Sequence, residues 1–472
     1  MSMMEAEKQV LDQLEKGSAG YLEDVRAAIR QPSVSRTGEG IEAMATWLIS
    51  YLGNLGAEAR RAPGIQFPII EGTLSSAGAV KTLLLYELYD VQPANETGWV
   101  SSPFEAVIHP VRGGGNKVVG RGAFNSKGPL VGFLTVLRAF RDAGIPLPVN
   151  VRFLIEGEEE IGSPSLVAYV HRHLDQLKKC HAAFIPYMAT NSHGKTQIRL
   201  GFKGLALLEF SVEGGPWGGP VEHDLHAMHA AWVQSPAWEL LKALTSLQSE
   251  DGRLKVDGLD QFIMGPSQED HELLEKLGSS FDPDLWRVEL GIQRFKYKCD
   301  PVRLLRHLMF NPTLNIQSLW IGESKPEEEP PTVLSRRSVA HADLRLVPDM
   351  EVDTTLGCLR THLDRRGFEH VGVKVKSAYP WSKTSAREPV VQSLVAACRK
   401  HGGDVDIFPL HAGAAPLYVF SKILGIPFAF GGLGHGGLSH VANEYISVEG
   451  LRLFQRSMVS FLFDFARRGS EN

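Results

Sequence analysis

The sequence has few cysteines, no excess of basic charge and no long apolar runs. Its four cysteines (Cys180, Cys299, Cys358 and Cys398) are scattered over 472 residues, and none lies in a Cys-x-x-Cys spacing. This pattern excludes a disulfide framework and a thiolate zinc site, and it favours a reducing compartment. The formal net charge is −5, with 49 Lys+Arg against 54 Asp+Glu, which argues against a dedicated nucleic-acid-binding protein.

Targeting and membrane signals are also missing. Residues 1–8 lack the basic-then-apolar order of a secretory signal. The most apolar stretches, 82–85 and 458–465, are far shorter than the roughly 18 residues that a spanning helix needs. We therefore expect a cytoplasmic protein without a membrane or nucleic-acid partner.

Strands and helices alternate in the first part of the chain. Residues 81–88 and 150–156 are nearly continuous apolar runs, the pattern of strands that are buried on both faces of a parallel sheet. Apolar residues recur at helical spacing over 5–29, 41–55 and 129–143. This alternation predicts an α/β fold with a mostly parallel sheet.

The middle of the chain has a different pattern. Residues 205–212 are a predicted strand that begins a new unit, 338–346 alternates like a half-buried strand, and 237–248 is a predicted helix. The acidic, proline-rich segment 323–331 cannot propagate a helix or a central strand, so it is a predicted solvated loop. The middle is therefore predicted to be a separate α+β unit.

The α/β pattern resumes after about residue 387. It ends in a predicted amphipathic helix over 448–468, whose apolar residues form one stripe. We predict a discontinuous catalytic-type α/β domain, residues 1–211 and 389–472. An inserted α+β lid and dimerisation domain is predicted over 212–388.

Three polar segments follow predicted strands or lie between strand and helix: 88–93 (Leu-Tyr-Asp-Val-Gln-Pro), 120–129 (Gly-Arg-Gly-Ala-Phe-Asn-Ser-Lys-Gly-Pro) and 156–163 (Glu-Gly-Glu-Glu-Glu-Ile-Gly-Ser). Ligands of α/β sheets collect beyond the carboxyl ends of the strands, where such segments belong. Composition alone supports an active-site acid cluster at 158–160 and a solvated acidic turn equally well.

The order of these segments, over about residues 10–465, resembles the carnosinase, aminoacylase and succinyl-diaminopimelate desuccinylase family of two-zinc exopeptidases. The resemblance implies a zinc-exopeptidase fold with a lid through which the chain forms a homodimer, and dipeptidase-like or amidohydrolase chemistry on a small substrate. Further matches are Gly201-Phe202-Lys203-Gly204, Asp224-Leu225-His226, Thr332, Arg345-Leu346-Val347-Pro348 and His440-Val441-Ala442-Asn443-Glu444.

The metal-binding positions depart from this family. By the resemblance, Leu88 replaces the first metal-binding histidine, Asn125 the bridging aspartate and Tyr187 the aspartate of the other site. The ligand types that remain are Glu160 and His440. Because one carboxylate cannot neutralise two close dications, we expect a degenerate site without a dinuclear centre. We expect no cofactor, or at most one divalent ion bound weakly by Asn125, Glu160 and His440.

The catalytic candidates follow from the same resemblance. Glu159 matches the general base, and Asp90 matches the residue that orients the lost histidine. His226 matches a histidine that reaches the partner subunit's site and stabilises an oxyanion. Tyr187 is either a proton donor or a side chain that fills the vacated metal position.

Substrate contacts are implied at four further positions. Arg345 matches the residue that holds a substrate carboxylate, although on its strand it could equally pair with a surface acid. Gly413 lies in the loop 412–416, which matches a Gly-Gly-Ser-x-Pro substrate loop without its serine. Thr332 is a lid marker, and the Asn125 amide can contact substrate.

The sequence therefore predicts a diverged dipeptidase-like enzyme that acts on a small amino-acid-like carboxylate by metal-independent acid–base chemistry of Glu159. General-base assistance supplies only about 10²–10⁴-fold, so ordinary peptide hydrolysis is not expected. C–N or C–C cleavage, acyl transfer and hydrolysis of an activated amide remain open. The alternatives are a catalytically silent ligand-binding homologue and a weak mononuclear metal hydrolase.

Overall fold

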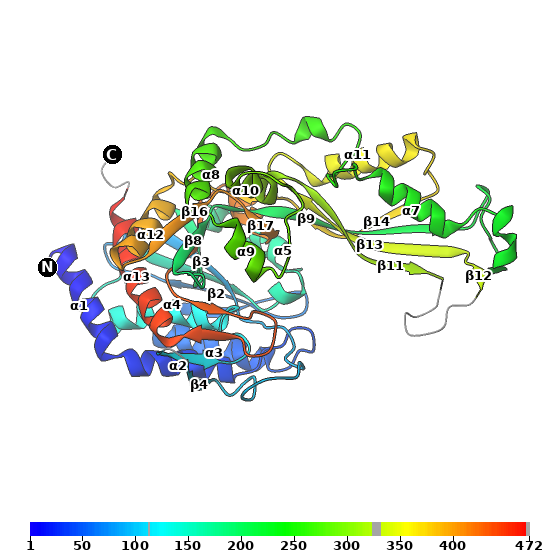
Figure 1. The fold of residues 1–472 in the computed structure, drawn as a ribbon. Coiled ribbons are helices and arrows are strands. Elements are labelled where there is room, and N and C mark those ends of the chain that lie inside the picture. Colours follow the sequence, from blue (N-terminus) through cyan, green and yellow to red (C-terminus); the bar gives the residue numbers. More distant parts are fainter. Residues whose placement is uncertain (112–113, 323–331, 469–472) are drawn as a thin grey trace. The chain divides into compact units, whose positions relative to one another are not determined.

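The computed structural model describes residues 1–111, 114–322 and 332–468 and forms two compact units (Figure 1). Unit 1 comprises Met1–Leu200, Thr384–Phe408 and Val419–Asn472, and unit 2 comprises Gly201–Lys383 and Pro409–Tyr418. The predicted domain boundary at residue 211 falls inside a continuous strand, β9 (Gly201–Glu213), which belongs wholly to unit 2. Residues 409–418, predicted to lie in the first domain, also belong to unit 2.

Unit 1 is built on an eight-stranded sheet whose central strands are parallel. Its strands, in spatial order, are β1 (Glu58–Ala62), β2 (Ile69–Leu74), β6 (Asn150–Glu156), β3 (Thr82–Leu88), β7 (Ala182–Pro186), β18 (Phe428–Gly431), β8 (Lys195–Arg199) and β16 (Asp404–Phe408). The two predicted buried strands, 81–88 and 150–156, correspond to β3 and β6, which are neighbours within the sheet. Most of their side chains are buried, as expected for strands covered on both faces.

Helices of unit 1 pack against this sheet. Phe184 of β7 contacts Phe133 of α4, with ring centroids 5.6 Å apart, and Phe461 of α13 at 4.5 Å. The helices are α1 (Met3–Lys16), α2 (Ser18–Arg30), α3 (Ile41–Asn54), α4 (Lys127–Asp142), α5 (Leu166–Arg172), α6 (Leu174–Leu177), α12 (Pro389–Lys400) and α13 (Val448–Arg467). Helical spacing over 5–29 thus corresponds to two helices, which meet at Gly17.

A second, four-stranded sheet in unit 1 carries the segments that flank the candidate site. Its order is β19 (Gly436–Gly437), β20 (Tyr445–Ser447), β5 (Asn116–Val119) and β4 (Val107–Pro110). Pairing of β20 with β5 brings the loop before residue 445 next to the loop after residue 119.

Unit 2 is an α+β structure around a six-stranded sheet. The main path is β11 (Thr313–Ile321), β13 (Arg337–Leu346), β9 and β14 (Gly372–Tyr379), and β15 (Ser382–Lys383) and β17 (His411–Ala414) also pair with β9. A two-stranded sheet joins β10 (Leu225–His226) to β12 (Val333–Leu334). The helices are α7 (Pro236–Ser246), α8 (Gln268–Ser280), α9 (Pro283–Glu289), α10 (Pro301–Phe310) and α11 (Val352–Arg365).

The core of unit 2 lies between the sheet and α7, whose Leu240 and Leu244 are buried with Phe210 of β9. The solvated loop predicted over 323–331 lies outside the described residues. Within the described part of the chain, no helix combines the length and the apolar character that crossing a bilayer requires.

Candidate functional site

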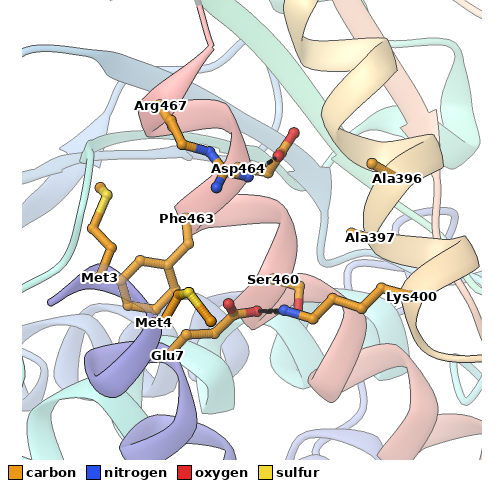
Figure 2. Close-up of a pocket in the computed structure, with 10 residues that line it drawn as sticks. All are labelled: Met3, Met4, Glu7, Ala396, Ala397, Lys400, Ser460, Phe463, Asp464 and Arg467. Atoms are coloured by element: carbon orange, nitrogen blue, oxygen red, sulfur yellow. Dashed lines mark hydrogen bonds and ion pairs between the residues drawn. The ribbon is translucent and has the colours of Figure 1, made fainter.

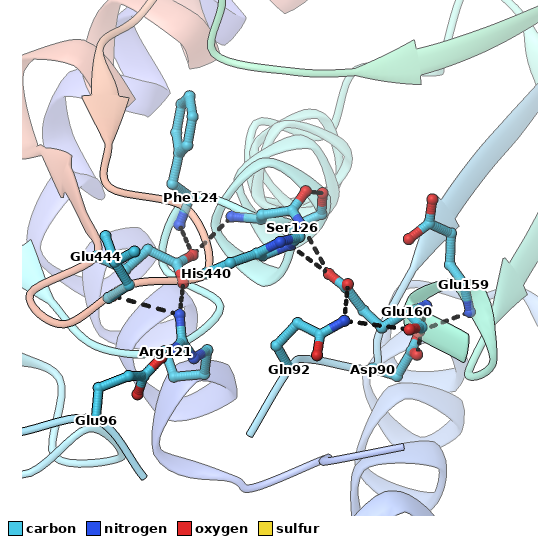
Figure 3. A network of polar contacts seen from close by, with 12 residues as sticks. Asp90, Gln92, Glu96, Arg121, Phe124, Ser126, Glu159, Glu160, His440 and Glu444 are labelled. Atoms are coloured by element: carbon cyan, nitrogen blue, oxygen red, sulfur yellow. Dashed lines mark hydrogen bonds and ion pairs between the residues drawn. The ribbon is translucent and has the colours of Figure 1, made fainter. Parts of the chain in front are cut away.

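Four loops of unit 1 bring the predicted residues together beyond the carboxyl ends of β3 and β6 (Figure 3). Asp90 follows β3, and Glu159 and Glu160 follow β6. Asn125 lies just before α4, and His440 lies in the loop before β20. The sheet therefore gathers these side chains at the edge where α/β proteins bind ligands.

Asp90 holds the loop that carries the two glutamates. Its Oδ1 accepts a hydrogen bond from the backbone N–H of Glu159 at 3.1 Å, and its Oδ2 accepts one from Glu160 at 3.0 Å. The side chain is fully buried, and burial raises the pKa of Asp90 to about 7. With its expected histidine partner replaced by Leu88, Asp90 thus acts on the backbone of the acid loop.

The turn that precedes these glutamates needs a glycine. A Cβ on Gly157 would lie 2.4 Å from ring atoms of Tyr89, far inside van der Waals contact. The Tyr89 hydroxyl is itself fixed, because it donates to the carbonyl of Pro68 at 2.7 Å. The close approach of Tyr89 therefore sets the path of the chain into Glu159.

Asn125, Glu160 and His440 form a triangle of contacts. Asn125 Nδ2 lies 2.6 Å from Glu160 Oε1 and 2.9 Å from His440 Nε2, and His440 Nε2 lies 3.1 Å from Glu160 Oε1. The hydrogen bond to Glu160 raises the pKa of His440. His440 has φ 66°, a left-handed conformation that is uncommon for a residue with a side chain. Gln92 Nε2 completes the group by donating to Glu160 Oε2 at 2.8 Å.

A buried ion pair fixes the loop that carries Asn125. Arg121 and Glu444 are almost wholly buried and lie 3.0 Å apart, Nη1 to Oε2. Glu444 Oε1 also accepts hydrogen bonds from the backbone of Phe124 at 2.9 Å and Asn125 at 2.8 Å. Sequence reasoning missed these positioning residues, although both lie inside motifs that it had singled out.

Glu159 differs from its neighbours because its carboxyl has no hydrogen-bond partner among the described residues. In Figure 3 the carboxyl stands apart from the contacts that bind Glu160 and Asp90. Removal from water, followed by the charges of Glu160 and Asp90, raises the pKa of Glu159. A half-buried carboxyl on a fixed backbone, with both oxygens free, suits proton transfer.

Leu88 and Tyr187 occupy the positions at which the family resemblance places metal ligands. Leu88 is 7% exposed. The Tyr187 ring packs against Phe124 at 4.9 Å and Phe430 at 5.1 Å between centroids. Burial raises the pKa of Tyr187 to about 12, so its hydroxyl keeps its proton at neutral pH. The aromatic contacts agree with the space-filling role, and the retained proton leaves the donor role available.

The other predicted residues belong to unit 2. Arg345 on β13 donates from Nε to Asp343 Oδ1 at 2.9 Å, and this acidic partner is buried, unlike the surface acid of the alternative interpretation. His226 ends β10, is exposed, and accepts from the backbone of Met228 at 3.2 Å. Thr332 is exposed next to β12, and Gly413 lies in β17.

A second hollow in unit 1 lies between α1, α12 and α13 and includes none of the predicted site residues (Figure 2). Its polar groups are already paired with one another, Glu7 with Lys400 and Asp464 with Arg467. We therefore do not regard this hollow as a competing active site.

The donor atoms present do not fit a pair of metal ions. Among the residues that the structure describes, no three His, Cys, Asp or Glu side chains are grouped to hold a metal ion. The triangle of Asn125, Glu160 and His440 is closer to the needs of one ion. Zinc ligands at about 2.0–2.2 Å from the metal stand roughly 3.3 Å apart, slightly wider than the 2.6–3.1 Å seen here.

Three known proteins with similar sequence or structure are named as peptidases. The Cys-Gly metallodipeptidase dug1 of Schizosaccharomyces pombe is 26% identical over 66% of this chain and 63% of its own length. Cys-Gly metallodipeptidase DUG1 of Candida albicans is 25% identical over 93% of both chains. The M20 family metallo-carboxypeptidase Sso-CP2 of Sulfolobus solfataricus superposes with a TM-score of 0.85 and 28% identity, over 94% of this chain and 99% of that one. The predicted α/β fold of zinc-exopeptidase architecture is thereby confirmed.

The expectation of no cofactor, or at most one weakly bound divalent ion, is contradicted. Both yeast relatives are named metallodipeptidases. The expectation came from counting the charges of the lost ligands, and it allowed the donors that converge, Asn125, Glu160 and His440, no more than one weakly bound ion. This chain spans less than two thirds of the length of the S. pombe protein.

The predicted family resemblance is confirmed by the family comparison. The family described as Peptidase family M20/M25/M40 matches residues 84–464, which include most of β3, all of β6, all four site loops and the whole of unit 2. This chain belongs to the M20/M25/M40 peptidase family.

Proposed function

We propose that the protein acts on a small amino-acid-like carboxylate by acid–base chemistry of Glu159, rather than by two-zinc peptide hydrolysis. The observation that carries the proposal is the free carboxyl of Glu159, set on a backbone that Asp90 holds through hydrogen bonds. Two of the family's metal positions, by contrast, are filled by Leu88 and the packed ring of Tyr187.

Burial and the adjacent negative charges raise the pKa of Glu159, which makes its carboxylate a stronger base. Asp90 keeps the carboxyl in place, since it binds the Glu159 N–H. Tyr187, which stays protonated, is available as a hydrogen-bond donor. These groups suit a substrate whose reacting proton is more acidic than that of water. They also suit a substrate whose reacting bond is already activated.

Unit 2 is proposed to supply the substrate contacts. Asp343 engages Arg345 through Nε, and Arg345 Nη1 and Nη2 have no partner among the described residues, so they are available for a substrate carboxylate. His226 is proposed as an oxyanion donor, and Gly413 and Thr332 as further contacts; the Asn125 amide, which belongs to unit 1, is proposed as another.

A second candidate function is mononuclear metal-assisted hydrolysis, which the convergence of three donor side chains favours. Asn125, through its amide oxygen, Glu160 and His440 would hold the ion, which would polarise a substrate carbonyl. Gln92 would orient Glu160 through its hydrogen bond, and Glu444 would keep Asn125 in place through the backbone.

We also propose a cytoplasmic homodimer formed through unit 2. Its edge strand β11 is largely exposed and presents Ile316, Leu319, Trp320 and Ile321, an apolar edge suited to pairing with a second copy. Light scattering coupled to gel filtration tests this, and a monomeric mass at micromolar concentration would contradict it.

The test of function is turnover of a panel of dipeptides and N-acyl amino acids by wild type, Glu159→Gln and Glu160→Gln. Each protein is assayed after chelation and after addition of zinc or manganese. Chelator-insensitive turnover that Glu159→Gln abolishes supports the main proposal. Turnover that requires added metal and is lost in Glu160→Gln supports the mononuclear hydrolase. Absence of turnover, with ligand binding unchanged by Glu159→Gln, contradicts both and indicates a binding protein.

A further inference from the structure

A polar hollow in unit 1 lies over strands β1, β2 and β6, and none of the predicted site residues lines it. Its volume is about 340 Å³, and Gln176 of α6 lines it together with the three strands. This volume is within the range of small-molecule pockets. The hollow is therefore a candidate binding site that is separate from the Glu159 site.

Three side chains of the hollow form one row across the strands. Glu58 of β1 pairs in register with Thr73 of β2, and Thr73 pairs with Arg152 of β6. Residues that pair directly on neighbouring strands project from the same face of the sheet. The row therefore has a carboxylate at one end, a hydroxyl in the middle and a guanidinium at the other end.

The neighbouring row of the same face is neutral. Arg60 Nε donates to Glu71 Oε1 at 2.6 Å, and Glu71 Oε2 accepts from the Tyr169 hydroxyl. Arg60 is two residues from Glu58 along β1, so the two side chains share a face. Arg60 and Glu71 thus line the hollow without adding a net charge to it.

The charges of the first row have no counter-charge among the described residues. Glu58 is exposed and has neither an ion pair nor a side-chain hydrogen bond there, and the Thr73 hydroxyl is also unpaired. The partners of Arg152 are neutral, namely Gln176 Oε1 at 2.8 Å from Nη2 and the Tyr169 hydroxyl. Its Nε has no partner within the same part of the chain. An anionic group at Arg152 and a cationic group at Glu58 would both be favourable.

The length of the row limits the size of the ligand. Directly paired residues are about 5 Å apart between Cα atoms, so Glu58 and Arg152 are about 10 Å apart. Strand side chains stand roughly perpendicular to the sheet, so their charged ends keep about this separation. Two hydrogen bonds of about 2.8 Å leave roughly 4 Å for the ligand. The ammonium nitrogen and the farther carboxylate oxygen of an α-amino acid are about 3.6 Å apart.

We propose that the hollow binds the zwitterion of a free α-amino acid between Arg152 and Glu58. Arg152 and the Thr73 hydroxyl donate to the carboxylate, and Glu58 accepts from the ammonium group. This binding site goes beyond the proposed function and does not depend on it.

Calorimetry with L-methionine as the probe tests this assignment. Glu58→Gln and Arg152→Met should each weaken binding by about 10-fold or more, because each removes a charged hydrogen-bond partner. Glu15→Gln, which removes an exposed carboxylate of α1, is the matched control and should bind within about 2-fold of wild type. Acetate, which offers the carboxylate alone, should bind more weakly than methionine and be insensitive to Glu58→Gln.

Crystals that contain ordinary methionine, soaked in free L-selenomethionine, locate the bound amino acid by its anomalous signal. We expect a selenium peak in the hollow in wild type and in Glu159→Gln, and its loss in Glu58→Gln. Glu58 is exposed, so this variant decides the outcome even where Arg152→Met does not fold. A peak at the Glu159 site alone, no peak, wild-type affinity in Glu58→Gln, or acetate binding as tightly as methionine overturns the inference.

Discussion

Replacing Glu156 by Gln should remove a pH-dependent loss of stability. Burial of this carboxyl raises its pKa from 4.5 to about 8. The folded protein then holds the Glu156 proton more tightly than the unfolded chain, so its free energy of unfolding falls as the pH rises from 4.5 to 8. At ~1.4 kcal/mol per pH unit, the total over this interval is about 5 kcal/mol. The Gln carbonyl can still accept from Tyr86 and Ser163.

Urea unfolding between pH 4.5 and 9, followed by circular dichroism, measures this difference. The two proteins should have equal stability near pH 4.5, and Glu156→Gln should be more stable by a margin that grows until about pH 8 and then stays constant. Because Gln and Glu have nearly the same shape, we expect the substitution to leave packing unchanged. A difference in the free energy of unfolding that is the same at every pH would indicate altered packing instead. Parallel stability curves for the two proteins would refute the idea that a buried, uncompensated carboxyl limits stability here.

Two further changes test the scaffold of the site. Gly157→Ala should lower stability by about 1–3 kcal/mol in thermal unfolding, because its Cβ would overlap the Tyr89 ring, whereas the control Gly53→Ala, with open space around its Cβ, should be neutral or slightly stabilising. Equal melting temperatures for these two variants would contradict the close approach. Arg121→Met should cost about 3–5 kcal/mol in the same assay, because it leaves the buried Glu444 carboxylate without its cation; a loss below 1 kcal/mol would contradict that role.

The sequence predicted the fold, and its motifs marked the loops that meet in the candidate site, because both depend on local patterns. Continuous apolar runs identified β3 and β6, and polar motifs after them identified the loops that converge. The domain boundary was harder to predict from the sequence. Strand β9 continues from Gly201 to Glu213 without a compositional break, and its membership of unit 2 depends on pairing with β13 and β14.

The roles of individual side chains depended on contacts that sequence patterns do not encode. Asp90 was assigned to a lost histidine, yet its oxygens bind two backbone N–H groups. Glu444 accepts a hydrogen bond from the backbone N–H of Asn125, although the two residues are more than three hundred positions apart in the sequence. Glu58, Thr73 and Arg152 come from three separate segments, and they form one row because β1, β2 and β6 pair.

The proposed function requires that the side chains present do not hold two bridged metal ions. Crystals grown with zinc, with data collected on both sides of the zinc absorption edge, test this most directly when wild type is compared with the triple variant Leu88→His, Asn125→Asp, Tyr187→Asp. The account predicts two anomalous peaks at the site in the variant and no such pair in the wild type. Two zinc ions bridged at Asn125 in the wild type would contradict it.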